Sequence, residues 1–140
     1  MKDVLKMIAQ YSQTQPNDIA VQHRGESLSY LELETYSNRL AAQLSNSSAP
    51  VVVYGHMSPF MIVGMIAALK ARCGYVPIDQ SIPANRISHI LEKVVPQYII
   101  NTTDATIGQH VSTEYFIQDI QSFTEETPFT TIKGDEIAYT

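Results

Sequence analysis

The stretch that decides the fold is PVVVYGHMSPFMIVGMIAALKARCGYVPID, residues 50–79. Its β-branched run at 51–53 predicts a strand that is buried on both faces, as strands of parallel sheets are. Ser58 and Pro59 follow as a helix start signal, a hydroxyl N-cap before a proline at the first helical position. The helix expected over 60–71 is apolar nearly all round, and a second strand follows at 75–78. Strand, buried helix and strand in succession predict parallel pairing.

Two further elements are expected before this stretch. Apolar residues at helical spacing predict a short amphipathic helix over 4–11, which ends before Pro16. Residues 19–23 and 27–29 predict the two strands of a hairpin, with the chain turning between them. The N-terminal part of the chain therefore supplies a helix and a hairpin outside the parallel unit.

The helix that follows the hairpin has the clearest start signal in the sequence. Ser29 and Glu32 fit a capping box, in which each side chain satisfies a free backbone N–H near the other residue. An apolar stripe predicts the face turned to the core: Leu33, Leu40, Ala41 and Leu44. Polar residues of the same helix are expected to face elsewhere: Glu34, Asn38, Arg39 and Gln43. A polar loop at 45–48 closes it.

The alternation of strands and helices continues after residue 79. A helix is expected from Pro83 to a stop before Pro96, followed by a strand at 97–100. The rest of the chain predicts, in order, a polar loop at 101–109, a short strand at 115–117, a linker at 121–129, a turn at 133–136 and a strand at 137–140. This pattern predicts an α/β fold with a mostly parallel sheet and helices on both faces. Pro77 favours the end of its strand or the edge of the sheet.

Composition narrows the class of protein. The 140 residues, 44% of them hydrophobic, suffice for one domain with a core. Nine Lys and Arg against fourteen Asp and Glu give a net charge of −5, which disfavours nucleic-acid binding. The single cysteine, Cys73, excludes an internal disulfide and a multi-cysteine zinc site. No apolar run approaches the roughly 18 residues of a membrane span, and no apolar signal region follows Met1, so a cytoplasmic location is expected.

The residues alone reveal no complete chemical site. The six glycines form neither a GxGxxG nor a GxxxxGK[ST] loop, and the four histidines lack the spacing of a metal site. His56 follows a buried strand at the position where α/β folds place ligand contacts, but a turn residue is the leading interpretation. Asp79 ends the next strand, where a functional carboxylate and a loop cap are equally favoured. Cys73 is interpreted as a packing residue, since no base neighbours it.

Methionines at helical spacing, Met57, Met61 and Met65, are interpreted as core filling. On these grounds no catalytic, ATP-binding, substrate-binding or metal-binding residue is assigned within the chain.

Four segments resemble, in order and spacing, the N-terminal part of the adenylate-forming enzymes, which activate amino acids and other carboxylic acids. They are LSYLEL at 28–33, LKARCGYVPID at 69–79, PANRI at 83–87 and DEIAYT at 135–140. Arg72 stands where the second motif usually has glycine, and Gly74 where it usually has alanine. Both lie at an expected helix C-terminal turn, so the departures concern a cap rather than a chemical group.

The resemblance implies a ligase that uses ATP and Mg²⁺ in two steps, adenylation of a carboxylate and thioester formation on a phosphopantetheinylated carrier protein. VYGHMSP at 53–59 and SIPANR at 81–86 are most similar to the branch that activates D-alanine and charges a D-alanyl carrier protein for teichoic-acid D-alanylation. The alternatives are the adenylation domain of a nonribosomal peptide synthetase or another acyl-activating ligase. An alternative of another class is a non-enzymatic binding domain derived from the same fold.

The resemblance also implies that residues 1–140 are the N-terminal fragment of the large domain, truncated just before the phosphate-binding loop, which would lie beyond Thr140. Such a fragment is expected to be inactive alone and to bind neither ATP nor Mg²⁺. The apolar surface left by a cut inside a sheet favours self-association.

Overall fold

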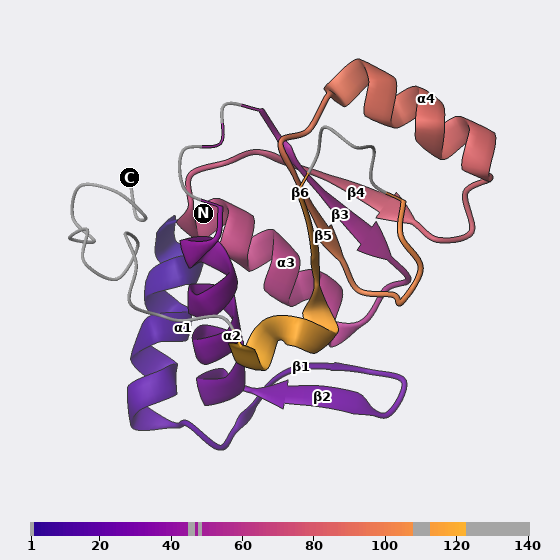
Figure 1. Ribbon diagram of the computed structural model, residues 1–140. Helices are drawn as coiled ribbons and strands as arrows, with labels where there is room; N and C mark the ends of the chain where they lie inside the picture. The colour runs from indigo at the N-terminus through magenta and orange to yellow at the C-terminus, as the bar shows by residue number, and fades with distance from the viewer. Residues whose placement is uncertain (1, 45–46, 48, 108–112, 123–140) are drawn as a thin grey trace.

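The computed structural model describes residues 2–44, 47, 49–107 and 113–122. Its helices are α1 (Lys2–Thr14), α2 (Tyr30–Ala42), α3 (Pro59–Lys70), α4 (Ala84–Val94) and the short 3₁₀ helix η1 (Ile117–Ser122). Its strands are β1 (Ile19–His23), β2 (Glu26–Ser29), β3 (Val51–Gly55), β4 (Tyr75–Asp79), β5 (Tyr98–Asn101) and β6 (Thr113–Phe116) (Figure 1). No helix among these residues is long and apolar enough to cross a lipid bilayer.

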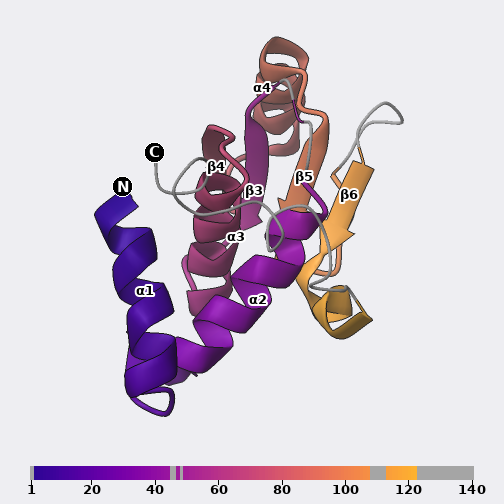
Figure 2. The ribbon, with the colours of Figure 1, turned by 90° about the vertical axis from the view of Figure 1, so that its left-hand side faces the viewer.

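A parallel sheet forms the centre of the molecule. Among the described residues its strand order is β4-β3-β5-β6, and every neighbouring pair is parallel. Helix α4 covers one face, and α1, α2 and α3 form a layer on the other (Figures 1 and 2). The predicted α/β fold with a mostly parallel sheet and helices on both faces is therefore confirmed. Pro77 lies on β4, the edge strand beside β3, as its missing N–H predicts.

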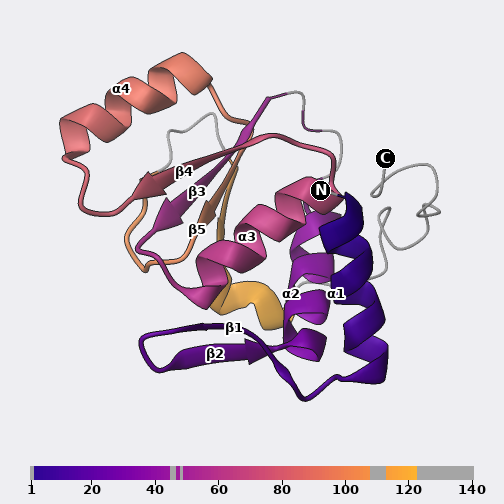
Figure 3. The same cartoon turned by 180° about the vertical axis from the view of Figure 1, so that it is seen from behind.

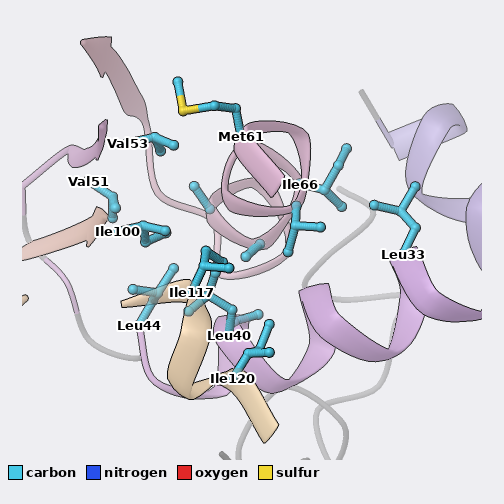
Figure 4. Close-up of a cluster of buried hydrophobic side chains, with 14 of the residues drawn as sticks. Leu33, Leu40, Leu44, Val51, Val53, Met61, Ile66, Ile100, Ile117 and Ile120 are labelled. Atoms are coloured by element: carbon cyan, nitrogen blue, oxygen red, sulfur yellow. The ribbon is translucent and has the colours of Figure 1, made fainter. Parts of the chain in front are cut away.

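Alternate residues of β3 feed two separate cores. Val52 and Tyr54 pack with Ile78 and Ile99 against Ile87 and Leu91 of α4. Val51 and Val53 point to the opposite face, into a larger cluster built by α2, α3, β5 and η1 (Figure 4). The predicted stripe lies in this larger cluster, with every member buried: Leu33, Leu40, Ala41 and Leu44.

Both predicted helix starts are confirmed. The Glu32 N–H donates to Ser29 Oγ over 3.1 Å, and the Ser29 N–H donates to Glu32 Oε1 over 2.9 Å, which completes the capping box. At α3 the Met61 N–H donates to Ser58 Oγ over 3.4 Å, with Pro59 at the first helical position. A cap of this kind contributes about 1 kcal/mol, so these signals fix where the helices begin rather than how stable the domain is.

The predicted hairpin is also present. Strands β1 and β2 pair antiparallel and lie against the N-terminal end of α3 (Figure 3). Arg24 and Gly25 turn the chain with positive φ angles of 49° and 86°. The departure at Arg72 lies at the end of α3 with φ of 63°, a left-handed conformation that glycine adopts without strain, so this position is a helix cap as predicted.

Two sequence predictions about side-chain orientation are wrong. Glu34 and Asn38 do not face away from the core, because they receive the ammonium group of Lys70, which is completely buried. Met57 is not core filling: 49% of its surface is exposed, since it precedes the Ser58 cap and lies outside the helical register that buries Met61.

The Lys70 ammonium is held at the interface of α2 and α3. Its Nζ donates to Glu34 Oε1 over 2.7 Å, to Ser37 Oγ over 2.8 Å and to Asn38 Oδ1 over 2.7 Å. Three acceptors match the three donors of an ammonium group. A cation removed from water is tolerated only with such partners, so the polar face of α2 is built around the last turn of the apolar helix α3.

The C-terminal elements differ slightly from the prediction. Strand β5 ends at Asn101 rather than at Ile100, and Ile117 begins η1 instead of ending β6. Ile117 and Ile120 are both buried, and helical spacing lets both reach the core, which a strand would not. Some predicted segments lie outside the described residues. They are the linker beyond Ser122, the turn at 133–136, the strand at 137–140, and the loop residues 45–46, 48 and 108–109.

Removal of the Glu34 carboxylate is predicted to destabilise the fold strongly. Glu34→Ala leaves the buried Lys70 charge without its counter-ion, so we expect the free energy of unfolding to fall by about 3 kcal/mol. Urea denaturation followed by circular dichroism measures the change. The matched control is Glu92→Ala on the exposed side of α4, expected to stay within about 0.5 kcal/mol. A loss below about 1 kcal/mol for Glu34→Ala would contradict the role given to the ion pair.

Candidate functional site

The candidate site is a cavity at the carboxyl edge of the parallel sheet. His56 follows β3, Gln80 follows β4, and Thr102, Thr103 and Asp104 follow β5, so residues far apart in sequence meet where these strands end. They line a cavity of about 600 Å³. Ligand sites of open α/β sheets lie outside the carboxyl ends of the strands, which makes this cavity the first place to look.

The other walls of the cavity come from helices. Tyr36 of α2 and Phe60 of α3 face it with their ring centroids 6.1 Å apart, and Ile117, Gln118 and Ile120 of η1 complete the lining. Tyr36, Phe60, Ile117 and Ile120 also belong to the larger core or pack against it. The cavity is thus continuous with the core on one side and bounded by the strand ends on the other.

A buried amide organises the loop after β5. Asn101 is fully buried, and its Nδ2 donates to Glu114 Oε2 over 2.6 Å and to the Ala105 carbonyl over 2.8 Å. Its Oδ1 accepts from the Thr103 N–H over 2.7 Å and from Thr103 Oγ1 over 2.6 Å. The amide therefore uses all of its hydrogen-bonding capacity on this loop and on Glu114.

The Glu114 carboxylate on β6 ties down the far part of the same loop. It also accepts from Thr106 Oγ1 over 2.5 Å and from the Ile107 N–H over 3.0 Å. The sequence identified 101–109 only as polar loop; the pairing of Asn101 with Glu114 depends on strand register and has no local signal.

Strand β3 and the loop after β5 approach each other closely at Gly55. The Thr102 N–H and hydroxyl both donate to the Tyr54 carbonyl, over 2.9 Å and 3.0 Å. Gly55 has φ of 151°, and a Cβ added to it would lie 1.8 Å from Thr102 Oγ1. Only glycine fits here, because any side chain would push the loop away from the strand.

The three residues weighed from the sequence occupy different places. His56 is exposed and borders both the main cavity and a smaller hollow of about 240 Å³, which Asp79 also lines. Asp79 accepts hydrogen bonds from the Ser81 hydroxyl and, over 2.9 Å, from the Ser81 N–H. These bonds hold the pKa of the Asp79 carboxyl below its usual value, with a smaller contribution from His56. Asp79 therefore caps its own loop.

Cys73 is half-buried between α3 and β4, where burial raises the pKa of its thiol. A raised pKa keeps the thiol protonated at neutral pH, the opposite of an activated nucleophile. The environment agrees with the packing role inferred from the sequence.

The cavity offers shape and hydrogen-bonding groups. Within the described residues its lining contains neither Lys nor Arg, and Asp104 is its one carboxylate. Among the same residues, no group of three or more His, Cys, Asp and Glu side chains is placed to hold a metal ion. Within the described residues, this cavity therefore lacks the lysine, arginine and metal-ligand groups that stabilise the phosphates of MgATP in adenylation.

Solved structures define the class of this fold. O-succinylbenzoate coenzyme A synthetase (MenE) from Bacillus subtilis, in complex with AMP, matches with a TM-score of 0.70 and 15% identity, over 86% of this chain and 33% of that one. NpsA from Klebsiella oxytoca, in complex with 3-hydroxyanthranilyl-AMSN, matches with a TM-score of 0.67 and 22% identity, over 87% of this chain and 26% of that one. The fold is that of adenylate-forming enzyme domains.

The sequence narrows the assignment further. The model of the AMP-binding enzyme family matches residues 8–138, and the chain belongs to that family. Curated relatives include the D-alanine–D-alanyl carrier protein ligases of Staphylococcus haemolyticus and Staphylococcus epidermidis, 43% and 41% identical over the whole of this chain. The chain spans 29% of the length of each. The resemblance drawn from the sequence motifs is confirmed.

Replacement of Gly55 by alanine is predicted to break the carboxyl edge of the sheet. Steric overlap with Thr102 and the positive φ act together, so we expect a loss of about 4 kcal/mol in the free energy of unfolding. Gly25→Ala is the matched control: its φ is also positive but nothing lies within 4 Å of the added carbon, so about 1 kcal/mol is expected. Thr102→Ala in the Gly55→Ala background should recover part of the loss; equal costs for the two single variants would refute the close approach.

Removal of the Ser81 hydroxyl is predicted to raise the pKa of Asp79. A carboxyl whose pKa is lowered by folding stabilises the fold above its unfolded pKa, and that stability is lost as the pH falls through the folded pKa. Ser81→Ala removes the larger hydrogen bond, so the carboxyl should titrate closer to its ordinary range. Carboxyl ¹³C chemical shifts followed from pH 7 down report the titration, with Ser88→Ala on α4 as control. An unchanged Asp79 titration in Ser81→Ala would show that another group sets the pKa.

Proposed function

We propose that this chain is the N-terminal part of an AMP-forming ligase that activates D-alanine and charges a D-alanyl carrier protein. The observation that carries the proposal is the 43% identity with such a ligase along the entire chain. The fold agreement with adenylate-forming enzymes supports the same reading. Residues 1–140 would form the first part of the large domain, with the phosphate-binding loop after Thr140.

The proposed reaction has two balanced steps. The D-alanine carboxylate attacks the α-phosphorus of MgATP, the bond to pyrophosphate breaks, and the D-alanyl adenylate forms. The phosphopantetheine thiol of the carrier protein then loses its proton and attacks the adenylate carbonyl, which expels AMP and leaves a thioester. We assign no catalytic or binding residue among the described residues.

The proposed contribution of this chain is structural. The β3–α3–β4 unit and its neighbours build a sheet whose carboxyl edge is rigid, because the loop after β5 is held by Asn101 and Glu114. The proposed substrate implies a role in teichoic-acid D-alanylation. It also implies a cytoplasmic location, where ATP is available.

The test is amino-acid-dependent ATP–pyrophosphate exchange by the complete polypeptide encoded by the gene. We expect D-alanine to support exchange at least about tenfold better than L-alanine, and the 140-residue chain alone to support none. Preference for an L-amino acid would favour the adenylation domain of a nonribosomal peptide synthetase. Absence of exchange with every amino acid offered would favour another acyl-activating ligase or a binding domain.

A further inference from the structure

We propose that the cavity at the carboxyl edge of the sheet is a protein interface, which receives an apolar segment with a basic residue from another part of the same enzyme. This inference rests on the proposed function, because the occupant is the remaining polypeptide of the ligase. It assigns the cavity to assembly of the large domain and excludes it as a pocket for a small substrate.

Two hydroxyl groups that line the cavity are already bonded within the protein, while the His56, Gln80, Asp104 and Gln118 side chains also line it. The Thr102 hydroxyl donates to the Tyr54 carbonyl, and the Thr103 hydroxyl lies within hydrogen-bond distance of Asn101 Oδ1 and the Ala105 carbonyl. A small-ligand pocket instead presents a few polar groups that converge on its occupant. A volume of about 600 Å³ suits either kind of occupant, so the chemistry of the lining decides between them.

The apolar part of the lining fits a side chain from a protein segment. Phe60 faces the cavity while remaining only partly buried, beside the buried Ile117 and Ile120. A partly buried aromatic ring in a preformed hollow is a typical anchor point of a protein interface. The chain spans only 29% of the length of its ligase relatives, so a partner surface of the required size exists within those proteins.

Charge defines the rim of the interface. Asp104 is exposed and is the only carboxylate among the described lining residues, which disfavours phosphate and carboxylate ligands and favours a Lys or Arg of the incoming segment. The loop that carries Asp104 is fixed by Asn101, so the rim is formed before the partner arrives and little ordering is needed on docking.

The experiment compares thiol labelling of the same position in the 140-residue chain and in the complete enzyme. Gln118→Cys places a thiol at an exposed position of the lining, in a Cys73→Ala background that removes the native thiol. Without ligands, we expect labelling to be at least about 100-fold slower in the complete enzyme than in the chain alone. Glu92→Cys on α4 is the matched control and should label at similar rates in both proteins.

Three outcomes would overturn the proposal. Equal labelling of Gln118→Cys in both proteins would show that nothing covers the cavity. Protection of the complete enzyme only after addition of D-alanine and ATP would identify a ligand pocket. Labelling of the short chain that slows with its own concentration would make a second copy the occupant.

A second measurement avoids substitutions altogether. Hydrogen exchange of the unsubstituted proteins should be slower across residues 102–107 and 117–120 in the complete enzyme than in the short chain, while α4 exchanges alike in both. ATP–pyrophosphate exchange is measured on the same preparation. ATP–pyrophosphate exchange with D-alanine, without slower hydrogen exchange in these segments, would refute the interface and leave the proposed function standing. Slower hydrogen exchange without ATP–pyrophosphate exchange would support the interface and refute the proposed function.

Discussion

Strand β3 must be apolar on both faces, and most of the structure depends on this constraint. It hydrogen-bonds to β4 on one side and β5 on the other, and each face is covered by helices. Its valines are completely buried, and full burial of such a side chain contributes roughly 1.5–3 kcal/mol. Helix α3 lies so close that a Cβ on Gly64 would come within 2.9 Å of Val53, so even the small residues of α3 are set by this strand. The remaining helices pack against the apolar surfaces that α3 and the sheet present.

The parallel register of β3 with β4 and β5 also determines the geometry of the candidate site. Because Gly55 pairs with Asp79 and Tyr54 pairs with Asn101, the three strands end together and their loops emerge side by side. The loop after β5 is then fixed by Asn101 and Glu114, whose side chains meet across the neighbouring strands β5 and β6. A shift of one residue in the pairing would exchange the β3 residues that face the two cores and would move these strand ends apart. The geometry of the cavity is therefore as firmly specified as the core.

The sequence predicts those features whose signals are local. The β-branched run of β3, the capping box of α2 and the proline at the start of α3 each occupy a few consecutive residues and were sufficient to predict the sheet and its helices. The Lys70 network could not be predicted in this way, since helical periodicity places Glu34 and Asn38 on a polar face and does not reveal the cation opposite. The same holds for the cavity: the position of His56 after a strand is a local signal, whereas nothing in the sequence around Tyr36 and Phe60 indicates that they line it.

The buried positive charge of Lys70 stabilises the fold and is not available to a ligand. Adenylation chemistry requires cations or a metal near the phosphates, yet no lysine or arginine among the described residues lines the cavity. Lys70, which belongs to one of the segments that resemble the family, is completely buried and neutralised by Glu34, so it cannot reach a nucleotide. The first family motif likewise contains the Ser29 and Glu32 cap, which holds a helix end. Sequence motifs of an enzyme family are often taken to mark its active site, but the motifs within the described residues contain helix ends and buried contacts. In a site at this edge of the sheet, these residues would hold the strands and loops in position. The charged groups that bind phosphate would come from other residues.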